Sequence, residues 1–234
     1  MAARAEFWNN LKVDLGKTPV AVFDFSEREG ETDLAVIGRP PTAREIYDLQ
    51  TQGGGIFVAY LPQQFFDRLG LKPMAEFVSE TPSLPPIYRA LVTQQDKNIA
   101  PRFVTWLDLQ EHKYGSKSPV ETAQVCRALF EVLNKSPKMI DDELNDVFWR
   151  TFSLDGNVPL ISGSPRLLQD RRGHTELLLT IAKELGLPQI AFTVETADRE
   201  TFGSMRYDKA RALAQKQGIP LVTGKQIMEY SAQI

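Results

Sequence analysis

The chain has 234 residues, 42% of them hydrophobic, and is long enough to bury a substantial core as one domain over residues 1–234. Its formal net charge of −3 provides no general basic field, which argues against nucleic acid as a partner. One cysteine excludes an internal disulfide and fits a reducing compartment. Two histidines and that cysteine are too few for a zinc site with several His or Cys ligands, so any metal should be bound mainly by oxygen.

The N-terminal segment predicts an amphipathic helix over residues 2–16, because Phe7, Leu11 and Leu15 recur at helical spacing. The segment does not resemble a signal peptide. No apolar run approaches the roughly 20 residues needed to span a bilayer. We therefore expect a soluble, cytoplasmic protein with no membrane association.

A densely charged segment follows this helix, with the sequence Glu27-Arg28-Glu29-Gly30-Glu31-Thr32-Asp33. It lies between two apolar, β-branched runs at residues 19–23 and 34–37, which predict two buried strands. The acids therefore lie where two strands meet. A solvated hairpin tip is the commoner interpretation of such a segment taken alone, because charged residues are mostly exposed.

If this segment is extended, side-chain alternation places Glu29, Glu31 and Asp33 on one face, while Arg28 points away. Three carboxylates that face one space repel one another. They stay ionised together only if water, a cation or a donor offsets the repulsion, and otherwise one of them takes up a proton. Both outcomes suit acid/base or metal chemistry.

Helices and strands then alternate along the chain. A capping box of Thr42 and Glu45 opens a helix, three glycines end it, and residues 56–61 predict a strand that is covered on both faces. A short helix follows from Pro62. This order favours a sheet with helices packed on its faces. The proline-rich stretch 80–101 predicts a long loop with one helical turn.

The second half begins with a predicted strand at residues 103–107 and continues into the segment Lys113-Tyr114-Gly115-Ser116-Lys117-Ser118 before a helix. Hydroxyls and backbone N–H groups at a helix start suit an anion, and Lys117 adds positive charge. Turn chemistry is the commoner explanation of such a segment. Cys126 lies inside the helix as a packing residue, and the acids at 141–143 predict the start of another helix.

A second charged motif, Arg171-Arg172-Gly173-His174-Thr175-Glu176, precedes an apolar helical stripe. A helix start beside two arginines disfavours imidazolium and leaves a nitrogen of His174 free for a metal or a proton, although a hydrogen-bonded capping histidine is equally consistent. Arg171 and Arg172 are either solvated charges or an anion clamp. Further on, a predicted strand runs directly into Glu195, and a carboxylate at a strand end often lines a site.

Together, the two charged motifs resemble the signature of the 3,4-dihydroxy-2-butanone 4-phosphate synthase family, and the first is closest to archaeal members. Residues 69–74 resemble the family's Leu-Gly-Leu-x-x-Met stretch, and residues 218–230 match its closing strand and helix. The resemblance implies an α/β (α+β) fold with a mixed sheet, and a homodimer with active sites at the subunit contact. It also implies a magnesium-dependent lyase that converts the sugar phosphate ribulose 5-phosphate to 3,4-dihydroxy-2-butanone 4-phosphate and formate in riboflavin biosynthesis.

The resemblance also implies roles for individual residues. Glu29 and His174 would hold Mg²⁺, with Mn²⁺ as a possible substitute. Proton removal beside a carbonyl leaves an enediolate, whose charge a Lewis acid stabilises. Glu31 or Glu195 would carry that proton. The groups around the sugar would be Arg28, Glu31, Asp33 and Glu195, and those around the phosphate Arg171, Thr175, Ser116, Lys117 and Ser118.

The middle of the chain departs from the family pattern. Phe57 stands where the family carries a cysteine, and the Thr-Gly-Ile-Ser loop is replaced by residues 114–117. Val120 and Glu121 replace an Asp-Arg pair, and Gly156-Asn157-Val158 replaces Gly-His-Val. These changes leave two alternatives open: a relative that acts on another hydroxy-carbonyl compound, and a non-catalytic binding protein. We expect Phe57 and Tyr114 to narrow the pocket, and Lys117→Ala to raise KM for a phosphorylated substrate more than it lowers kcat.

Overall fold

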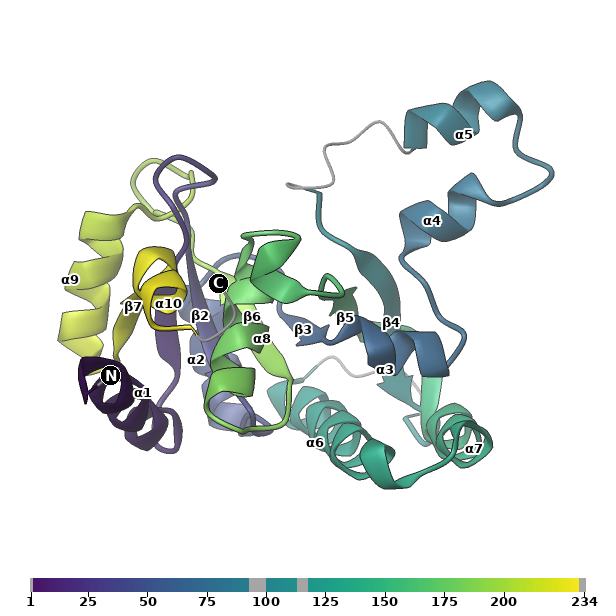
Figure 1. Cartoon of the computed structure of the whole chain (residues 1–234), viewed down its shortest axis with the longest axis horizontal. Coiled ribbons are helices and arrows are strands. Elements are labelled where there is room, and N and C mark those ends of the chain that lie inside the picture. The colour runs from purple at the N-terminus through teal and green to yellow at the C-terminus, as the bar shows by residue number, and fades with distance from the viewer. Residues whose placement is uncertain (1, 93–99, 113–117, 232–234) are drawn as a thin grey trace.

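The computed structural model describes residues 2–92, 100–112 and 118–231, and within them a seven-stranded mixed sheet carries helices on both faces (Figure 1). The strands are β1 (Val20–Phe23), β2 (Thr32–Ile37), β3 (Val58–Leu61), β4 (Phe103–Leu109), β5 (Phe152–Ser162), β6 (Ala191–Glu195) and β7 (Leu221–Thr223). Their order across the sheet is β4-β5-β3-β6-β2-β1-β7. The α-helices are α1 (Ala2–Leu15), α2 (Ala43–Gln52), α3 (Gln63–Arg68), α4 (Met74–Ser79), α5 (Pro86–Val92), α6 (Pro119–Lys135), α7 (Asp141–Thr151), α8 (His174–Glu184), α9 (Tyr207–Gln217) and α10 (Gly224–Tyr230). The predicted fold class is confirmed.

Strand pairing brings distant parts of the chain to one place. β2 pairs antiparallel with both β1 and β6, and this register sets Asp33 opposite both Val22 and Glu195. β3 pairs antiparallel with β6 and parallel with β5. The beginning of β2 and the end of β6 therefore lie side by side at one end of the sheet.

Successive side chains along each strand point to opposite faces of the sheet, and each face is covered by an apolar layer. Side chains such as Val22, Val58 and Ala191 pack with α1, α8 and α10 on one face. Side chains such as Leu34, Leu61 and Phe192 pack with α2, α6 and α7 on the other. Helix α8 is buried along most of its length, so its first residues are held against the sheet.

Most predicted elements are present, including the capping box of Thr42 and Glu45. The stretch over residues 80–101 was predicted as a loop with one helical turn at Tyr88 to Leu91, and a helix is present there as α5, which is longer than predicted and spans Pro86–Val92. Among the α-helices and strands of the described residues, α4 and β5 had no prediction. The first half of β5 is largely exposed and has no apolar alternation, and its register against β4 is irregular, so no period-two pattern marks it.

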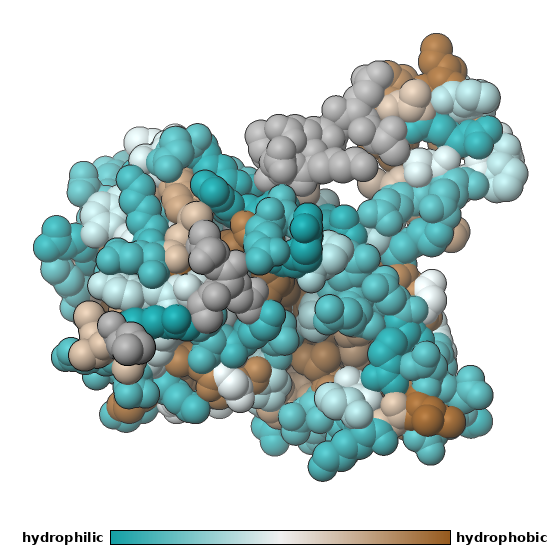
Figure 2. All heavy atoms as spheres, viewed as in Figure 1, coloured by the Kyte–Doolittle hydropathy of each residue, from teal (hydrophilic) through white to brown (hydrophobic). Residues whose placement is uncertain are grey.

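Helices α4 and α5, over residues 74–92, form an arm that projects from the rest of the structure (Figure 1). Neither helix has a buried side chain. Figure 2 shows hydrophobic side chains at the far end of this arm, and the exposed apolar residues on it are Met74, Phe77, Ile87, Tyr88 and Leu91. Among the helices of the described residues, none has the length and apolar character required to cross a membrane.

Candidate active site

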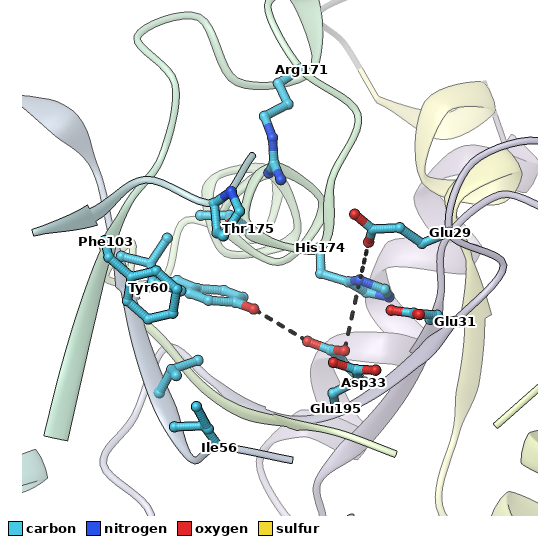
Figure 3. A pocket seen from close by; sticks show the side chains of 13 residues that line it. Glu29, Glu31, Asp33, Ile56, Tyr60, Phe103, Arg171, His174, Thr175 and Glu195 are labelled. Carbon is cyan, nitrogen blue, oxygen red and sulfur yellow. Dashed lines mark hydrogen bonds and ion pairs between the residues drawn. The ribbon is translucent and has the colours of Figure 1, made fainter. Parts of the chain in front are cut away.

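A cavity of about 260 Å³ opens where β2 begins and β6 ends. Figure 3 shows two kinds of wall: acidic side chains and His174 on one side, and Tyr60, Phe103 and Ile56 on the other. The cavity is lined by Glu29, Glu31, Asp33, Ile56, Val58, Tyr60, Pro101, Phe103, Ile161, Arg171, His174, Thr175 and Glu195. The structure thus brings together both charged motifs and the carboxylate at the end of β6.

The acidic segment forms a turn over residues 26–29, where an extended strand was one expectation. The buried carboxylate of Asp24 organises this turn, because it accepts hydrogen bonds from the backbone N–H groups of Glu31 at 2.9 Å and Glu29 at 3.3 Å. Arg28 does not point away. Its Nη1 lies 2.6 Å from Glu29 Oε2 and 3.1 Å from Asp24 Oδ2, because the turn brings the guanidinium back towards both carboxylates.

His174 begins helix α8, and its imidazole lies beside the paired residues Val22 and Asp33 of the β1–β2 hairpin. Its Nε2 lies 3.2 Å from the carbonyl oxygen of Val22, which can only accept a hydrogen bond. A neutral imidazole therefore carries its proton on Nε2 and leaves the Nδ1 lone pair towards the cavity. Nδ1 lies 3.8 Å from Glu29 Oε2 and 3.7 Å from Asp33 Oδ1, distances that are too long for hydrogen bonds.

This arrangement fits a divalent cation. Ligand atoms of Asp24, Glu29 and His174 lie within 4.8 Å of one another. Two carboxylates and one imidazole, oriented by its hydrogen bond to Val22, form a donor set that suits Mg²⁺ or Mn²⁺ with waters or substrate oxygens as the remaining ligands. Asp24 had no place in the sequence prediction, although an acid directly after an apolar strand was a signal that could have found it.

Asp33 is 3% exposed and extends from β2 towards His174. Its Oδ2 accepts hydrogen bonds from Thr193 Oγ1 at 3.1 Å and from the Tyr60 hydroxyl at 3.4 Å, so Oδ1 is the oxygen nearer to His174. Burial raises the pKa of the Asp33 carboxyl, and positive charge on His174, when its imidazole is protonated, opposes that shift. Burial also raises the pKa of Tyr60 well above its usual value, which keeps the phenol protonated as a donor.

Glu31, directly before β2, and Glu195, at the end of β6, share one hydroxyl. Ser204 Oγ lies 2.5 Å from Glu31 Oε1 and 3.0 Å from Glu195 Oε1. Burial is the main cause that raises the pKa of Glu31, with added repulsion from Glu195 and Glu29, while the bond from Ser204 lowers it. No motif or periodicity in the sequence marks Ser204, which follows β6 in a loop.

Arg171 lies at one end of the cavity, away from Glu31 and Glu195 (Figure 3). Its Nη1 is 2.7 Å from Oε2 of the buried Glu176, whose Oε1 accepts hydrogen bonds from the N–H and hydroxyl of Ser164 at 3.0 Å. Thr175 also lines this end. Arg172 is exposed and does not line the cavity, in agreement with the solvated-charge alternative.

Comparison with known proteins identifies the family. The model of the 3,4-dihydroxy-2-butanone 4-phosphate synthase family matches residues 13–230. The chain belongs to this family. The synthase from Archaeoglobus fulgidus is 27% identical over 229 residues, covering 96% of this chain and 93% of the relative. The Saccharomyces cerevisiae synthase is 24% identical and covers 90% of each chain.

Solved structures of the synthase family share the fold. A two-domain synthase from A. baumannii has a TM-score of 0.72 at 17% identity, and the match covers 97% of this chain and 57% of that one. A synthase in complex with two magnesium ions has a TM-score of 0.69 at 20% identity and covers 94% and 93%. The named relatives are lyase-type enzymes, some of them named for riboflavin biosynthesis.

Some residues that the synthase resemblance implicated lie away from the cavity. Arg28 does not line it and lies behind Glu29. Ser118 does not line it either: its hydroxyl and Glu121 form the capping box of α6, because a helix start needs partners for its first N–H groups. Ser116, Lys117 and Tyr114 lie outside the described residues.

The positions that depart from the synthase pattern are also placed by the structure. Phe57 was expected to narrow the pocket, but it is buried and stacks on Phe192, 6.4 Å between ring centroids, because strand alternation turns it to the other face. Its neighbours Ile56 and Val58 line the cavity instead. Val120 is exposed at the start of α6, and Asn157 is exposed on β5.

Proposed function

We propose that this protein catalyses the magnesium-dependent conversion of ribulose 5-phosphate to 3,4-dihydroxy-2-butanone 4-phosphate and formate. The observation that carries the proposal is the convergence of Glu29, Glu31, Asp33, His174 and Glu195 at one cavity, from three separate segments of the chain. Family membership supports the same reaction. Four acids and a histidine around one space are costly to keep together unless a ligand offsets their charge.

Glu29, Asp24 and Nδ1 of His174 would hold the cation, and Asp24 also fixes the turn through the backbone N–H groups of Glu29 and Glu31. When bound, Mg²⁺ or Mn²⁺ would supply Lewis acidity to negative charge that develops on substrate oxygens. Val22 orients the imidazole through the bond to Nε2. Arg28 orients the Glu29 carboxylate.

Glu31 and Glu195 are the groups that would move protons. Abstraction of a proton beside the substrate carbonyl requires a carboxylate within hydrogen-bond reach, and both of these face the cavity. The raised pKa of Glu31 makes it a stronger base than an ordinary glutamate once ionised. Asp33, held by Tyr60 and Thr193, would accept a hydrogen bond from a sugar hydroxyl.

The phosphate would lie at the end of the cavity formed by Arg171 and Thr175. This end contains the start of α8, where backbone N–H groups and the helix dipole favour an anion. The buried Glu176 holds Arg171 through a direct ion pair, which fixes the guanidinium but also offsets part of its charge. Additional positive charge from Lys117 remains a prediction of the sequence.

The deciding experiment measures formate. Purified protein with ribulose 5-phosphate and Mg²⁺ should release formate in equal amount to the sugar consumed. EDTA should stop the release and excess Mg²⁺ should restore it, because the cation sites are formed by only a few side-chain ligands. Release that continues at full rate in EDTA would contradict the metal assignment, and no release with Mg²⁺ would contradict the reaction.

A second candidate function is a related reaction on a different hydroxy-carbonyl compound, one that carries an apolar group. The favouring observation is the apolar wall opposite the acids, formed by Ile56, Val58, Phe103 and Ile161. Ile56 is 67% exposed at this wall, so it can contact a ligand. Turnover of such a compound in a substrate panel, with ribulose 5-phosphate inert, would select this reaction.

A further inference from the structure

The loop between β6 and α9, residues 196–206, folds back onto the acidic turn. Arg206 Nη1 donates hydrogen bonds to the carbonyl oxygens of Glu29 at 2.7 Å and Gly30 at 3.0 Å. Gly30 has a φ of +64°, and a Cβ at this position would lie 2.5 Å from Arg206 Nη1. Glycine is therefore favoured at this turn by its backbone conformation, and a side chain there would displace the end of Arg206.

Ser204 lies in the same loop, held by the bridge between Ala197 and Ser204 and by the bond from Met205 N–H to the carbonyl of Thr196. Its hydroxyl contacts the carboxyl groups of both Glu31 and Glu195. A hydroxyl has one proton to donate and lone pairs that accept. Ser204 can therefore donate its proton to either carboxylate, and it accepts in return only from a carboxyl group that is protonated, so the one hydroxyl connects Glu31 and Glu195.

We propose that Ser204 is a positioning residue for proton transfer, which holds the carboxyl groups of Glu31 and Glu195 in their reactive places. Ser204 does not line the cavity, so it acts through these two groups and does not contact the substrate. Glu31 precedes β2 and Glu195 ends β6, and the shared hydroxyl fixes the distance between them. The inference rests on the proposed function, because proton transfer at this cavity belongs to that reaction.

Kinetics provide the first test. Ser204→Ala should lower kcat by roughly 10- to 100-fold, since small displacements of reacting groups have effects of this size. KM for ribulose 5-phosphate and the Kd for Mg²⁺ should stay within about twofold of wild type. Ser204→Thr keeps the hydroxyl and should restore most of kcat. Thr201→Ala removes a hydroxyl that interacts with Gly203 N–H and Asp198 in the same loop but contacts neither glutamate, so it measures the effect of disturbing the loop and should leave all three constants unchanged.

A wild-type kcat in Ser204→Ala, or a change in KM alone, would overturn the proposal. Ser204→Thr separates loss of the hydroxyl from disturbance of the loop, because it changes the same position and keeps the hydroxyl. If circular dichroism shows that both variants are folded and Ser204→Thr has the same low kcat as Ser204→Ala, the proposal is also contradicted.

A second test needs no substrate. Thermal unfolding of Ser204→Ala, Glu195→Gln and the double variant, all in EDTA, measures whether the two side chains interact. We expect non-additive shifts, with the double variant close to the less stable single variant. Additive shifts in the unfolding temperature would show that Ser204 and Glu195 do not interact, and would contradict the proposal. If the wild-type protein failed to release formate, the proposed reaction would be contradicted. The comparison of the two single variants with the double variant would still show whether Ser204 and Glu195 interact.

Discussion

Glu29 and His174 come from segments about 145 residues apart in sequence and face each other across the cavity. We predict that Glu29→Gln and His174→Ala each weaken Mg²⁺ binding at least about tenfold, because each removes a side chain that the geometry places at the cation. Both variants should keep the wild-type fold. Isothermal titration calorimetry gives the affinity, and circular dichroism gives the fold.

Glu27→Gln is the matched control for this prediction. Glu27 lies in the same turn but is exposed, and its carboxylate accepts a hydrogen bond from Ser26. The same charge is removed without loss of a candidate ligand, so the Mg²⁺ affinity should be nearly that of wild type. Unfolding of Glu29→Gln or His174→Ala, or equal weakening in Glu27→Gln, would refute the assignment.

Substitution of Asp33 should raise the stability of the protein and remove its activity. The folded pKa of Asp33 is raised above the ordinary value of 3.8 by burial, so the ionised carboxylate weakens the folded state. This destabilisation is absent below the unfolded pKa, develops as the pH rises from the unfolded to the folded pKa, and is complete above the folded pKa. Asp33→Asn should therefore be more stable than wild type at pH 8, while its activity is lost.

The measurement is thermal unfolding in EDTA from pH 4 to pH 8. Each kcal/mol of relieved free energy raises the melting temperature by roughly 2–4 °C in a chain of this size. The amide oxygen introduced by Asp33→Asn can still accept the hydrogen bonds from Thr193 and Tyr60. The melting temperatures of wild type and Asp33→Asn should become equal as the pH falls towards 4. A stability difference that is independent of pH would show that ionisation of Asp33 is not its cause.

At the scale of elements, the start of α6 separates two roles for Ser118. The sequence suggested phosphate binding, whereas the structure places its hydroxyl in a capping box with Glu121. We predict that Ser118→Ala lowers stability by about 1 kcal/mol and leaves KM for the sugar phosphate unchanged, because a lost cap affects the helix and not the cavity. Thermal unfolding and steady-state kinetics measure the two effects.

Thr42→Ala is the matched control, since Thr42 forms the equivalent capping box with Glu45 at the start of α2. Both variants should lose similar stability with unchanged KM. A raised KM in Ser118→Ala but not in Thr42→Ala would place Ser118 at the phosphate after all.

At the scale of the whole molecule, we propose that the protein is a homodimer, as family resemblance implies. The arm of α4 and α5 supports this, because Phe77 and Ile87 are 64% and 67% exposed and a second copy would cover such side chains. Light scattering should give about twice the 26.3 kDa of one chain at micromolar concentration. A monomer at that concentration would refute the dimer.

The double variant Phe77→Asp with Ile87→Asp should produce monomers, because charge on the arm opposes burial against a partner. Ile140→Asp is the control, because Ile140 is 66% exposed at the start of α7, away from the arm. A dimer that persists in the double variant would place the contact elsewhere on the surface.

The sequence by itself determined the elements with clear periodicity and clear ends. Helix α8, the capping box of α2 and the strands beside the acidic turn follow from apolar spacing and local caps, which act over a few residues. Seven residues that the charged motifs, the strand end and the family resemblance singled out line the cavity: Glu29, Glu31, Asp33, Arg171, His174, Thr175 and Glu195.

Only the tertiary structure decided how these residues meet. The pairing of β2 with β6 sets Asp33 opposite Glu195, and the loop after β6 brings Ser204 to both glutamates. The orientation of Phe57 into the core was equally outside the reach of the sequence. Each of these features depends on strand register or on contacts between distant segments, and periodicity within one segment contains no information about its partner in space.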